Sequence, residues 1–215
     1  MLYPMIAYKP KTTDSKHWMR VYPNLIAELI IDRPDQLYVS DITYVLLQPH
    51  FCYVSLVTDA YSHKVVGCAI EQNLTADGPV RALEQALRQR KPQADGTYLP
   101  LIHHSDRGSQ YCSRRHTDLL KAHGVQISMT ENGSPYENAI AERINGILKY
   151  EFGIIEGFAS YEEAVKSIRQ AVKFYNELRP HLSCNYLTPN QAHKQRGKLL
   201  RRWKNKVYPK TQQTT

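Results

Sequence analysis

The sequence predicts an α/β fold in which helices flank a mixed sheet. Three observations support it. Three strand-like runs rich in Val, Ile, Tyr and Thr follow one another closely within residues 37–71, two shorter apolar runs come later, and amphipathic segments separate and follow those later runs. This order places the strands in one sheet and the helices on its faces.

The first three strands are predicted at Leu37–Leu47, Phe51–Tyr61 and Lys64–Glu71. The breaks between them are too short for a crossover helix, so an antiparallel meander is expected. An N-terminal arm, residues 1–35, precedes them. It is rich in Lys, Thr, Tyr and Pro, and we expect it to be extended, with a short helical turn at Leu25–Ile30.

Helices and strands then alternate. The predicted elements are a helix at Thr75–Arg90, a strand at Tyr98–His103, a helix from Ser113 to Gly124, a strand at Val125–Met129, a helix from Tyr136 and a helix at Tyr161–Leu178. Thr75 and Ser113 are the expected caps, because their hydroxyls can accept free N–H groups of the first turn. The whole order fits the ribonuclease-H-like plan, a five-stranded mixed sheet over residues 36–180.

The basic charge of the chain is concentrated at one end. The formal net charge is +8, and nine of the 28 Lys and Arg, with no Asp or Glu, lie from Arg179 onward. A basic C-terminal segment, residues 181–215, suits the phosphate backbone of nucleic acid. A solvated tail that aids solubility is the alternative.

Cysteine usage and hydropathy bear on the compartment. The four cysteines are Cys52, Cys68, Cys112 and Cys184. None forms a CxxC pair, and no Cys or His cluster has the spacing of zinc ligands. No N-terminal apolar run is long enough for a signal peptide or a membrane span. We therefore expect reduced cysteines, an intracellular protein and no membrane partner.

Asp106 and Glu142 have 35 residues between them, the spacing of the D-D-35-E motif. Two further pairs share this separation, Asp35 with Glu71 and Asp95 with Glu131. Context favours the first pair, because Asp106 follows an apolar run where a buried strand would end, the usual place for active-site groups in open α/β sheets. Asp35 and Asp95 lie in Pro or Gly turns, where Asp commonly bonds locally.

Glu142 lies in a helix with two distinct stripes. The apolar stripe holds Ile140, Ile144, Ile147 and Leu148, and the polar stripe holds Asn138, Glu142, Asn145 and Lys149. Burial of the first stripe would present Glu142 on the second, beside amides and a lysine suited to phosphate. An ordinary solvated helix face is the alternative.

Asp41 lies inside the strand-like run Tyr38–Leu47. A carboxylate within so apolar a strand is costly to bury unless it is paired, and a metal ion would offset that cost. A solvent-facing position is the alternative. Asp59 ends its strand and is interpreted as a turn-former. Adjacent His103 and His104 should point to opposite faces, so at most one can face a site.

At these residues the sequence resembles a known family. The blocks that carry the resemblance are Tyr38–Tyr44, His104–Tyr111, Glu137–Glu142, Tyr175–His181 and Leu187–Pro189. They are similar to the integrase catalytic core of insertion-sequence transposases, with the second-frame product of the IS-three family as the nearest group. Glu137 departs from the Asp that members commonly have there. Members also carry a helix-turn-helix region upstream, which this sequence begins too late to include; a fragment, an alternative start and half of a frameshifted pair remain open.

The resemblance implies a DNA transposase that cleaves mobile-element ends and transfers strands. Asp41, Asp106 and Glu142 would be its catalytic, metal-binding triad, holding two Mg²⁺ ions per site with Mn²⁺ able to substitute. Its partners would be element terminal inverted repeats, target DNA and further copies of the chain, at least a dimer on DNA, in the bacterial cytoplasm at the nucleoid. The implied DNA contacts are Arg107, Asn138, Arg143, Lys149, Arg179 and His181.

Two rival functions remain at this point. One is a truncated DNA-binding regulator of transposition without catalysis. The other is a different polynucleotidyl transferase, such as a retroelement integrase or a junction nuclease. The lack of a zinc-binding His/Cys module disfavours a complete retroviral-type enzyme.

Overall fold

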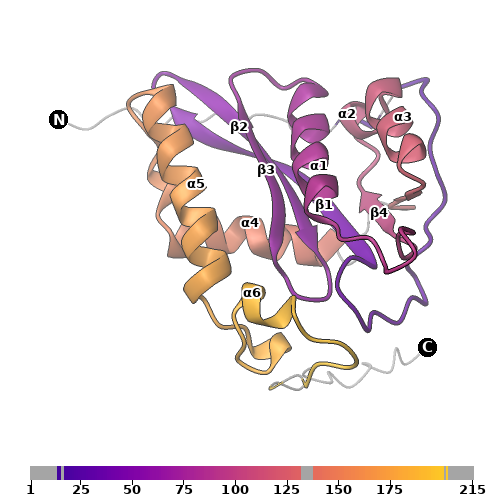
Figure 1. Cartoon of the computed structure of the whole chain (residues 1–215). Helices are drawn as coiled ribbons and strands as arrows, with labels where there is room; N and C mark the ends of the chain where they lie inside the picture. The colour runs from indigo at the N-terminus through magenta and orange to yellow at the C-terminus, as the bar shows by residue number, and fades with distance from the viewer. Residues whose placement is uncertain (1–13, 16, 132–137, 201, 203–215) are drawn as a thin grey trace, which may run out of the picture.

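Five strands form one mixed sheet in the computed structural model, which describes residues 14–15, 17–131, 138–200 and 202 (Figure 1). The strands are β1 Leu37–Leu47, β2 His50–Asp59, β3 Val65–Glu71, β4 Ile102–Ser105 and β5 Gln126–Met129. β1, β2 and β3 pair antiparallel, and β4 and β5 continue the sheet in parallel with β1. The order β3-β2-β1-β4-β5 puts β1 at the centre.

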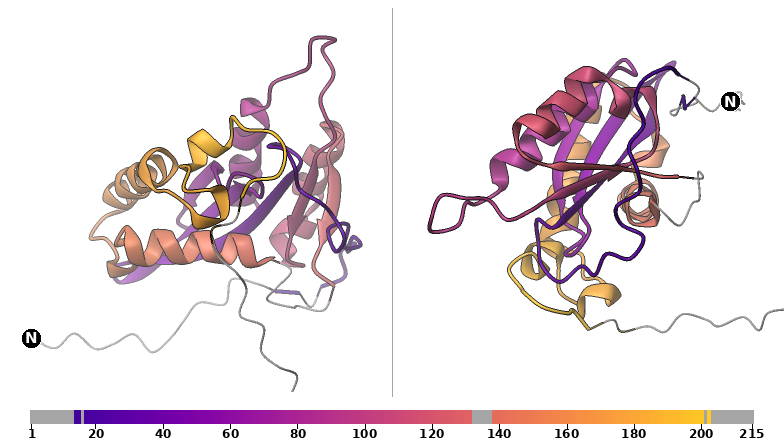
Figure 2. Two further views of the ribbon diagram at one scale, coloured as in Figure 1. Left: turned by 90° about the horizontal axis from the view of Figure 1, so that it is seen from below. Right: turned by 90° about the vertical axis from the view of Figure 1, so that its right-hand side faces the viewer.

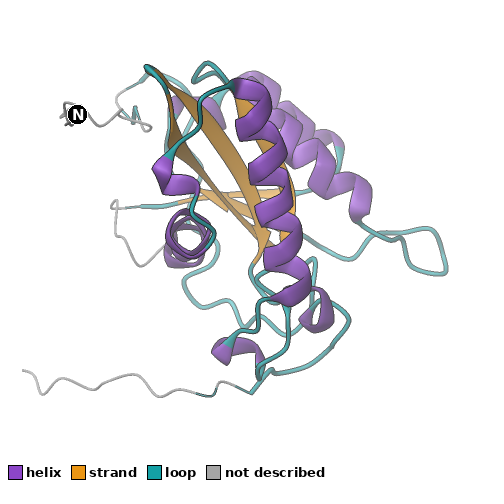
Figure 3. Cartoon of the chain, turned by 90° about the vertical axis from the view of Figure 1, so that its left-hand side faces the viewer, coloured by secondary structure: helices purple, strands orange, loops and turns teal. Residues whose placement is uncertain are grey.

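Helices cover both faces of this sheet (Figure 3). They are α1 Asp77–Gln89, α2 Ser109–Cys112, α3 Arg114–Ala122, α4 Ala139–Glu151, α5 Tyr161–Leu178 and α6 Pro189–Ala192, with the short 3-10 helices η2 Ile154–Glu156 and η3 Leu182–Cys184. One core lies under α1 and α3, and a second lies under α4 and α5. Tyr38 and Ile42 of β1 belong to the first core and Val45 to the second. By strand alternation, Asp41 faces the α4 side.

The N-terminal arm and the C-terminal segment pack against the sheet domain. The arm runs along the edge that β5 forms, where the Met129 N–H donates to the Pro23 carbonyl at 3.3 Å (Figure 2). Farther along the arm, the Asp32 carbonyl accepts the Gly197 N–H at 2.7 Å. The Tyr61 hydroxyl donates to the Gly197 carbonyl at 2.8 Å. These bonds dock the chain beyond α6 onto the core.

Most predicted elements are confirmed, and β1 and α5 have the predicted bounds. Ser113 caps α3 as expected, accepting the His116 N–H. Two predictions were wrong in detail. β4 begins at Ile102 rather than Tyr98, because residues 91–100 are exposed. Ala76, with no side-chain cap, replaces Thr75 as the N-cap of α1.

Several short helical elements were not predicted, namely α2, α6 and the two 3-10 helices. The predicted start of α4 near Tyr136 lies outside the described residues, as do Glu137 and residues 1–13 of the arm. None of the described helices combines the length and apolarity that a membrane span requires.

Candidate active site

Asp41 sits in the central strand, opposite Leu56 of β2. Its side chain is partly buried and is held by two donors. The Ile42 N–H donates to Oδ1 at 2.9 Å, and the Asn145 side-chain amide donates to Oδ2 at 2.6 Å. The second bond reaches from α4, so that helix fixes the orientation of the Asp41 carboxylate.

Asp106 directly follows β4, at the carboxyl end of a parallel strand. Its Oδ1 accepts the Gly108 N–H at 2.9 Å. A Cβ at Gly108 would lie 2.9 Å from that same oxygen, closer than Cβ atoms approach their neighbours. A side chain at position 108 would therefore displace the Asp106 carboxylate from its present position.

Glu142 lies in the first turn of α4 and is exposed. It precedes Asn145 by three residues, so the two side chains are neighbours on one helix face. Since Asn145 bonds Asp41, Glu142 is presented toward the same region of the sheet. Sequence reasoning put Asn145 on this polar stripe but gave it no role.

The three carboxylates share one electrostatic environment. The pKa of Asp41 is raised to about 7, first by burial and then by the negative charge of Asp106, with a smaller contribution from Glu142. The hydrogen bonds from Ile42 and Asn145 act in the opposite direction. A divalent cation would relieve this repulsion, and carboxylate oxygens are the ligands that Mg²⁺ prefers. The donor set therefore fits a metal ion.

A second group of metal-ligand side chains lies where β1 begins and where β2 and α6 end. Among the described residues, Asp35, Asp59 and His193 have ligand atoms that all lie within 4.8 Å of one another, a distance that the predicted triad does not meet. The ligand atoms of the predicted triad need not all lie within that distance, because the two ions of a two-metal centre themselves lie about 3.5–4 Å apart.

Hydrogen bonds within the protein explain why most of these side chains lie together. Asp59 is fully buried and accepts the Ser62 N–H and hydroxyl at 2.8 and 2.6 Å and the Asp35 N–H at 2.8 Å. Asp59 is thus the turn-former that the sequence predicted. The Ser62 hydroxyl also lies 3.0 Å from His193 Nδ1, which ties the end of α6 to the sheet. His193 was not predicted to have any role.

Two of the predicted DNA-contact residues are bonded within the protein near the triad. Arg107 donates from Nε to the Thr130 carbonyl and is partly buried. Asn138 is buried and donates to the Ser40 carbonyl at 3.1 Å, which joins the start of α4 to β1. This position favours a structural role for Asn138, and its contact with DNA stays a prediction.

The other predicted contacts lie farther along the chain. Arg143 is exposed, and Lys149 Nζ lies 4.5 Å from the Tyr44 ring centroid. Arg179 forms a bidentate pair with Glu151 at 2.6 and 2.7 Å. His181 is buried, and burial is the main cause that lowers its pKa to about 3. A neutral, buried imidazole is poorly suited to bind phosphate.

His103 and His104 are both fully buried in β4. His103 Nε2 lies 2.7 Å from the Ser40 hydroxyl, and His104 Nδ1 lies 2.8 Å from the Ser128 hydroxyl. These bonds give both rings roles within the sheet, joining β4 to its neighbours β1 and β5.

The chain matches two family models, both described as integrase core domain, over residues 31–135 and 123–189. It is 32% identical over 190 residues to the transposase for insertion sequence element IS904 of Lactococcus lactis, covering 87% of this chain and 73% of that protein. It is 33% identical over 186 residues to the transposase for element IS629 of Shigella sonnei, covering 86% and 61%. The insertion element IS600 31 kDa protein of Shigella sonnei is 36% identical over 180 residues, with 83% and 64% covered. The chain thus spans about three fifths of the length of the last two relatives.

Solved structures of retroviral integrases share the fold. The catalytic core domain of HTLV-2 integrase in complex with magnesium aligns with a TM-score of 0.58 at 18% identity, covering 75% of this chain and 97% of that one. The core domain of BIV integrase aligns with a TM-score of 0.54 at 20% identity, covering 74% and 93%. The predicted ribonuclease-H-like fold is confirmed, and this chain belongs to the family of insertion-sequence transposases that carry an integrase core domain.

Proposed function

We propose that this chain is the catalytic core of a DNA transposase that cleaves DNA at the ends of a mobile element and joins the ends to target DNA. Asp41, Asp106 and Glu142 are its catalytic residues. The observation that carries the proposal is that β1, the end of β4 and α4 bring the three carboxylates together: Asn145 of α4 bonds Asp41 at 2.6 Å, and burial, followed by the negative charges of Asp106 and Glu142, raises the pKa of Asp41 to about 7. Carboxylates concentrated in this way are what two-metal phosphoryl transfer requires.

Each residue of the site has a distinct task in this proposal. The three carboxylates hold two Mg²⁺ ions, or Mn²⁺ in their place. When bound, such ions generate a nucleophile from water and stabilise the attacking and leaving oxygens. Asn145 keeps the Asp41 carboxylate turned toward α4, and the Gly108 N–H fixes Asp106. Positions fixed in advance reduce the reorganisation needed at the transition state.

We infer the substrates and partners from the relatives. Those relatives are transposases for insertion sequence elements, so the DNA substrates would be the element's terminal repeats and a target site. Two ends must be cut and joined together, which requires at least a dimer on DNA. Such a protein would act at the bacterial nucleoid.

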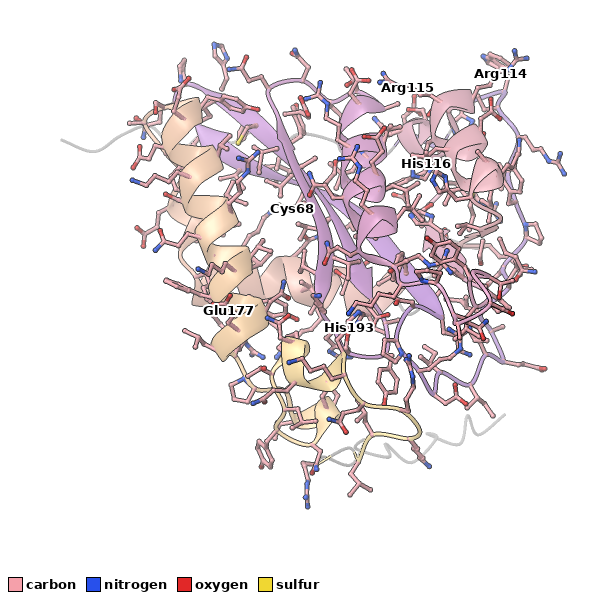
Figure 4. All side chains as sticks on the ribbon, in the orientation of Figure 1. Cys68, Arg114, Arg115, His116, Glu177 and His193 are labelled. Atoms are coloured by element: carbon pink, nitrogen blue, oxygen red, sulfur yellow. The ribbon has the colours of Figure 1, made fainter. Side chains whose placement is uncertain are left out.

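The deciding experiment is metal-dependent nicking and joining of branched DNA by the wild type and by Glu142→Gln. Glu142 is exposed, so losing its charge should leave the fold intact while removing a metal ligand. We expect a loss of at least about 100-fold, the scale of losing a group that stabilises the transition state. Glu177→Gln, the same change at an exposed residue of α5, is the matched control (Figure 4).

Three results would count against the proposal. Unfolding of Glu142→Gln would place that residue in the packing rather than at a metal. An equal loss of activity in Glu177→Gln would show that the effect of Glu142→Gln is not specific to the candidate site. DNA binding by the wild type without any cleavage in Mg²⁺ or Mn²⁺ would instead support a truncated DNA-binding regulator of transposition.

A further inference from the structure

Trp18 is exposed to an unusual degree. Its side chain is 89% exposed, more than that of any other large hydrophobic residue in the part of the chain that the structure describes. Tryptophan has a large apolar surface and is usually well buried. Isolated apolar residues are common on surfaces, so position must decide whether this one has a role.

The backbone on both sides of Trp18 is fixed. Met19 packs against the core under α1 and α3, and Tyr22 packs against the same core. His17 is partly buried and places Nε2 2.9 Å from the Arg107 carbonyl. Because His17 and Met19 on either side are partly buried, the exposure of Trp18 is a feature of the folded arm.

The anchors of Trp18 lie on the loop that follows Asp106. The Ser109 N–H donates to the Asp14 carbonyl at 3.0 Å, and His17 contacts the Arg107 carbonyl. These two contacts flank the peptide bonds directly after a carboxylate of the candidate site. The segment of the arm that carries the exposed indole is thereby fixed against the loop that carries Asp106.

The charges around Trp18 suit a DNA strand. Arg20 is exposed, and its guanidinium lies 4.9 Å from the centroid of the Tyr22 ring. The arm thus presents one exposed aromatic side chain, Trp18, and one exposed cation, Arg20, two positions apart. Cations that track the phosphates and aromatic faces on which bases stack are the two elements of single-strand binding sites.

We propose that Trp18 stacks on an unpaired nucleobase of the DNA strand whose phosphate is held at the Asp106 loop. The inference rests on the proposed function and names one element of its substrate, a frayed or single-stranded end. An unpaired base is required because bases within a duplex already stack on their neighbours and expose only their edges. Stacking on an indole tolerates any base, so the contact would not select sequence.

The composition of the chain allows a direct optical test. It has two tryptophans, and the second, Trp203, lies outside the described residues. In a Trp203→Phe protein, Trp18 is the sole indole fluorophore. We expect its emission to be quenched by a single-stranded oligonucleotide and by a duplex with a mismatched end, but little by a duplex whose ends are closed by hairpins. EDTA keeps the DNA uncut during the titration.

Binding gives a second, independent measurement. Trp18→Ala should weaken binding to the mismatched end about tenfold, the scale of one base–aromatic stack, and leave binding to the closed duplex unchanged. Trp18→Phe should restore most of the loss. Tyr98→Ala, which removes a 52% exposed aromatic residue from the loop after α1, is the matched control.

The outcomes separate this inference from the proposed function. Absence of quenching by open ends, or equal loss of affinity for open and closed duplexes, overturns the stacking role even if the wild type cleaves DNA. Quenching that grows with protein concentration in the absence of DNA also overturns it and assigns Trp18 to a contact between copies. If open ends quench the emission but the wild type does not cleave DNA in Mg²⁺ or Mn²⁺, the stacking role is supported and only the proposed catalytic function is contradicted.

Discussion

His103, Tyr111 and His116 form a buried aromatic cluster between β4 and α3. Their ring centroids lie 5.1 to 6.2 Å apart, and each side chain is at most 2% exposed. Burial lowers the pKa of His116 to about 4 and the pKa of His103 well below its usual value. Both imidazoles are therefore neutral in the folded protein at pH 7, which makes this cluster sensitive to acid.

The stability of the fold should fall as the pH drops from about 6.5 toward 4. In that window the unfolded chain, with an ordinary histidine pKa near 6.5, binds a proton that folded His116 does not. The free energy of unfolding is highest above the histidine pKa of the unfolded chain. The titration of His116 alone should lower that free energy by about 2 kcal/mol at pH 5. Urea unfolding at pH 8 and pH 5 measures this loss.

Replacement of the titrating ring provides the control. His116→Phe keeps an aromatic ring and should reduce the pH dependence by about the amount assigned to His116, whereas His50→Phe, at an exposed histidine, should not. Equal pH dependence in the wild type and His116→Phe would show that acid acts elsewhere in the molecule.

At the scale of elements, α1 approaches β3 closely because residue 67 is glycine. A Cβ built at Gly67 would lie 2.0 Å from the Ala82 carbonyl oxygen in the middle of α1. The obstacle is helix backbone, which cannot rotate away as a side chain can. A Cβ at Gly146, inside α4, would have no described atom within 4 Å apart from its chain neighbours and the adjacent backbone of its own helix.

Alanine substitutions at the two glycines should therefore change the free energy of unfolding in opposite directions. Gly67→Ala should destabilise the protein by about 1–3 kcal/mol, because α1 must move off the sheet. Gly146→Ala should stabilise it by about 0.5–1 kcal/mol, because alanine has the higher helix propensity and meets no neighbour. Denaturant midpoints of both variants check the pair, and a stabilised Gly67→Ala would refute the close approach of α1.

Sequence periodicity was sufficient for the long elements, as the correct bounds of β1 and α5 illustrate. It failed for α2 and α6, which have four residues each and depend on contacts with the rest of the fold. Local context was enough to nominate Asp41, Asp106 and Glu142, whose roles stay predictions. The bond from Asn145 to Asp41 spans 104 positions, and that from His193 to Ser62 spans 131, so neither pairing was visible in a local pattern.

At the scale of the whole molecule, the basic C-terminal segment has two parts. The described part of the segment, residues 181–200 and 202, is docked, since the Arg202 N–H donates to the Leu182 carbonyl at 2.9 Å and its guanidinium donates to the Asn185 side chain at 2.6 Å. Beyond it lie three more bases, Lys204, Lys206 and Lys210. Truncation at different points can therefore separate a packing role from an electrostatic one.

Deleting residues 203–215 should weaken DNA binding and flatten its salt dependence. Each lysine that neutralises a phosphate contributes about −0.9 to the slope of log affinity against log salt on duplex DNA, so the slope should flatten by up to about 3. Binding measured between 50 and 200 mM salt, roughly the range over which such effects are large, gives the slope.

Deletion after Lys194 is the informative comparison, because it also removes Gly197, whose backbone joins Asp32 and Tyr61, and should lower stability as well. An unchanged slope in the shorter deletion would mean that these lysines only solvate the chain and that DNA is held by the docked part and the core.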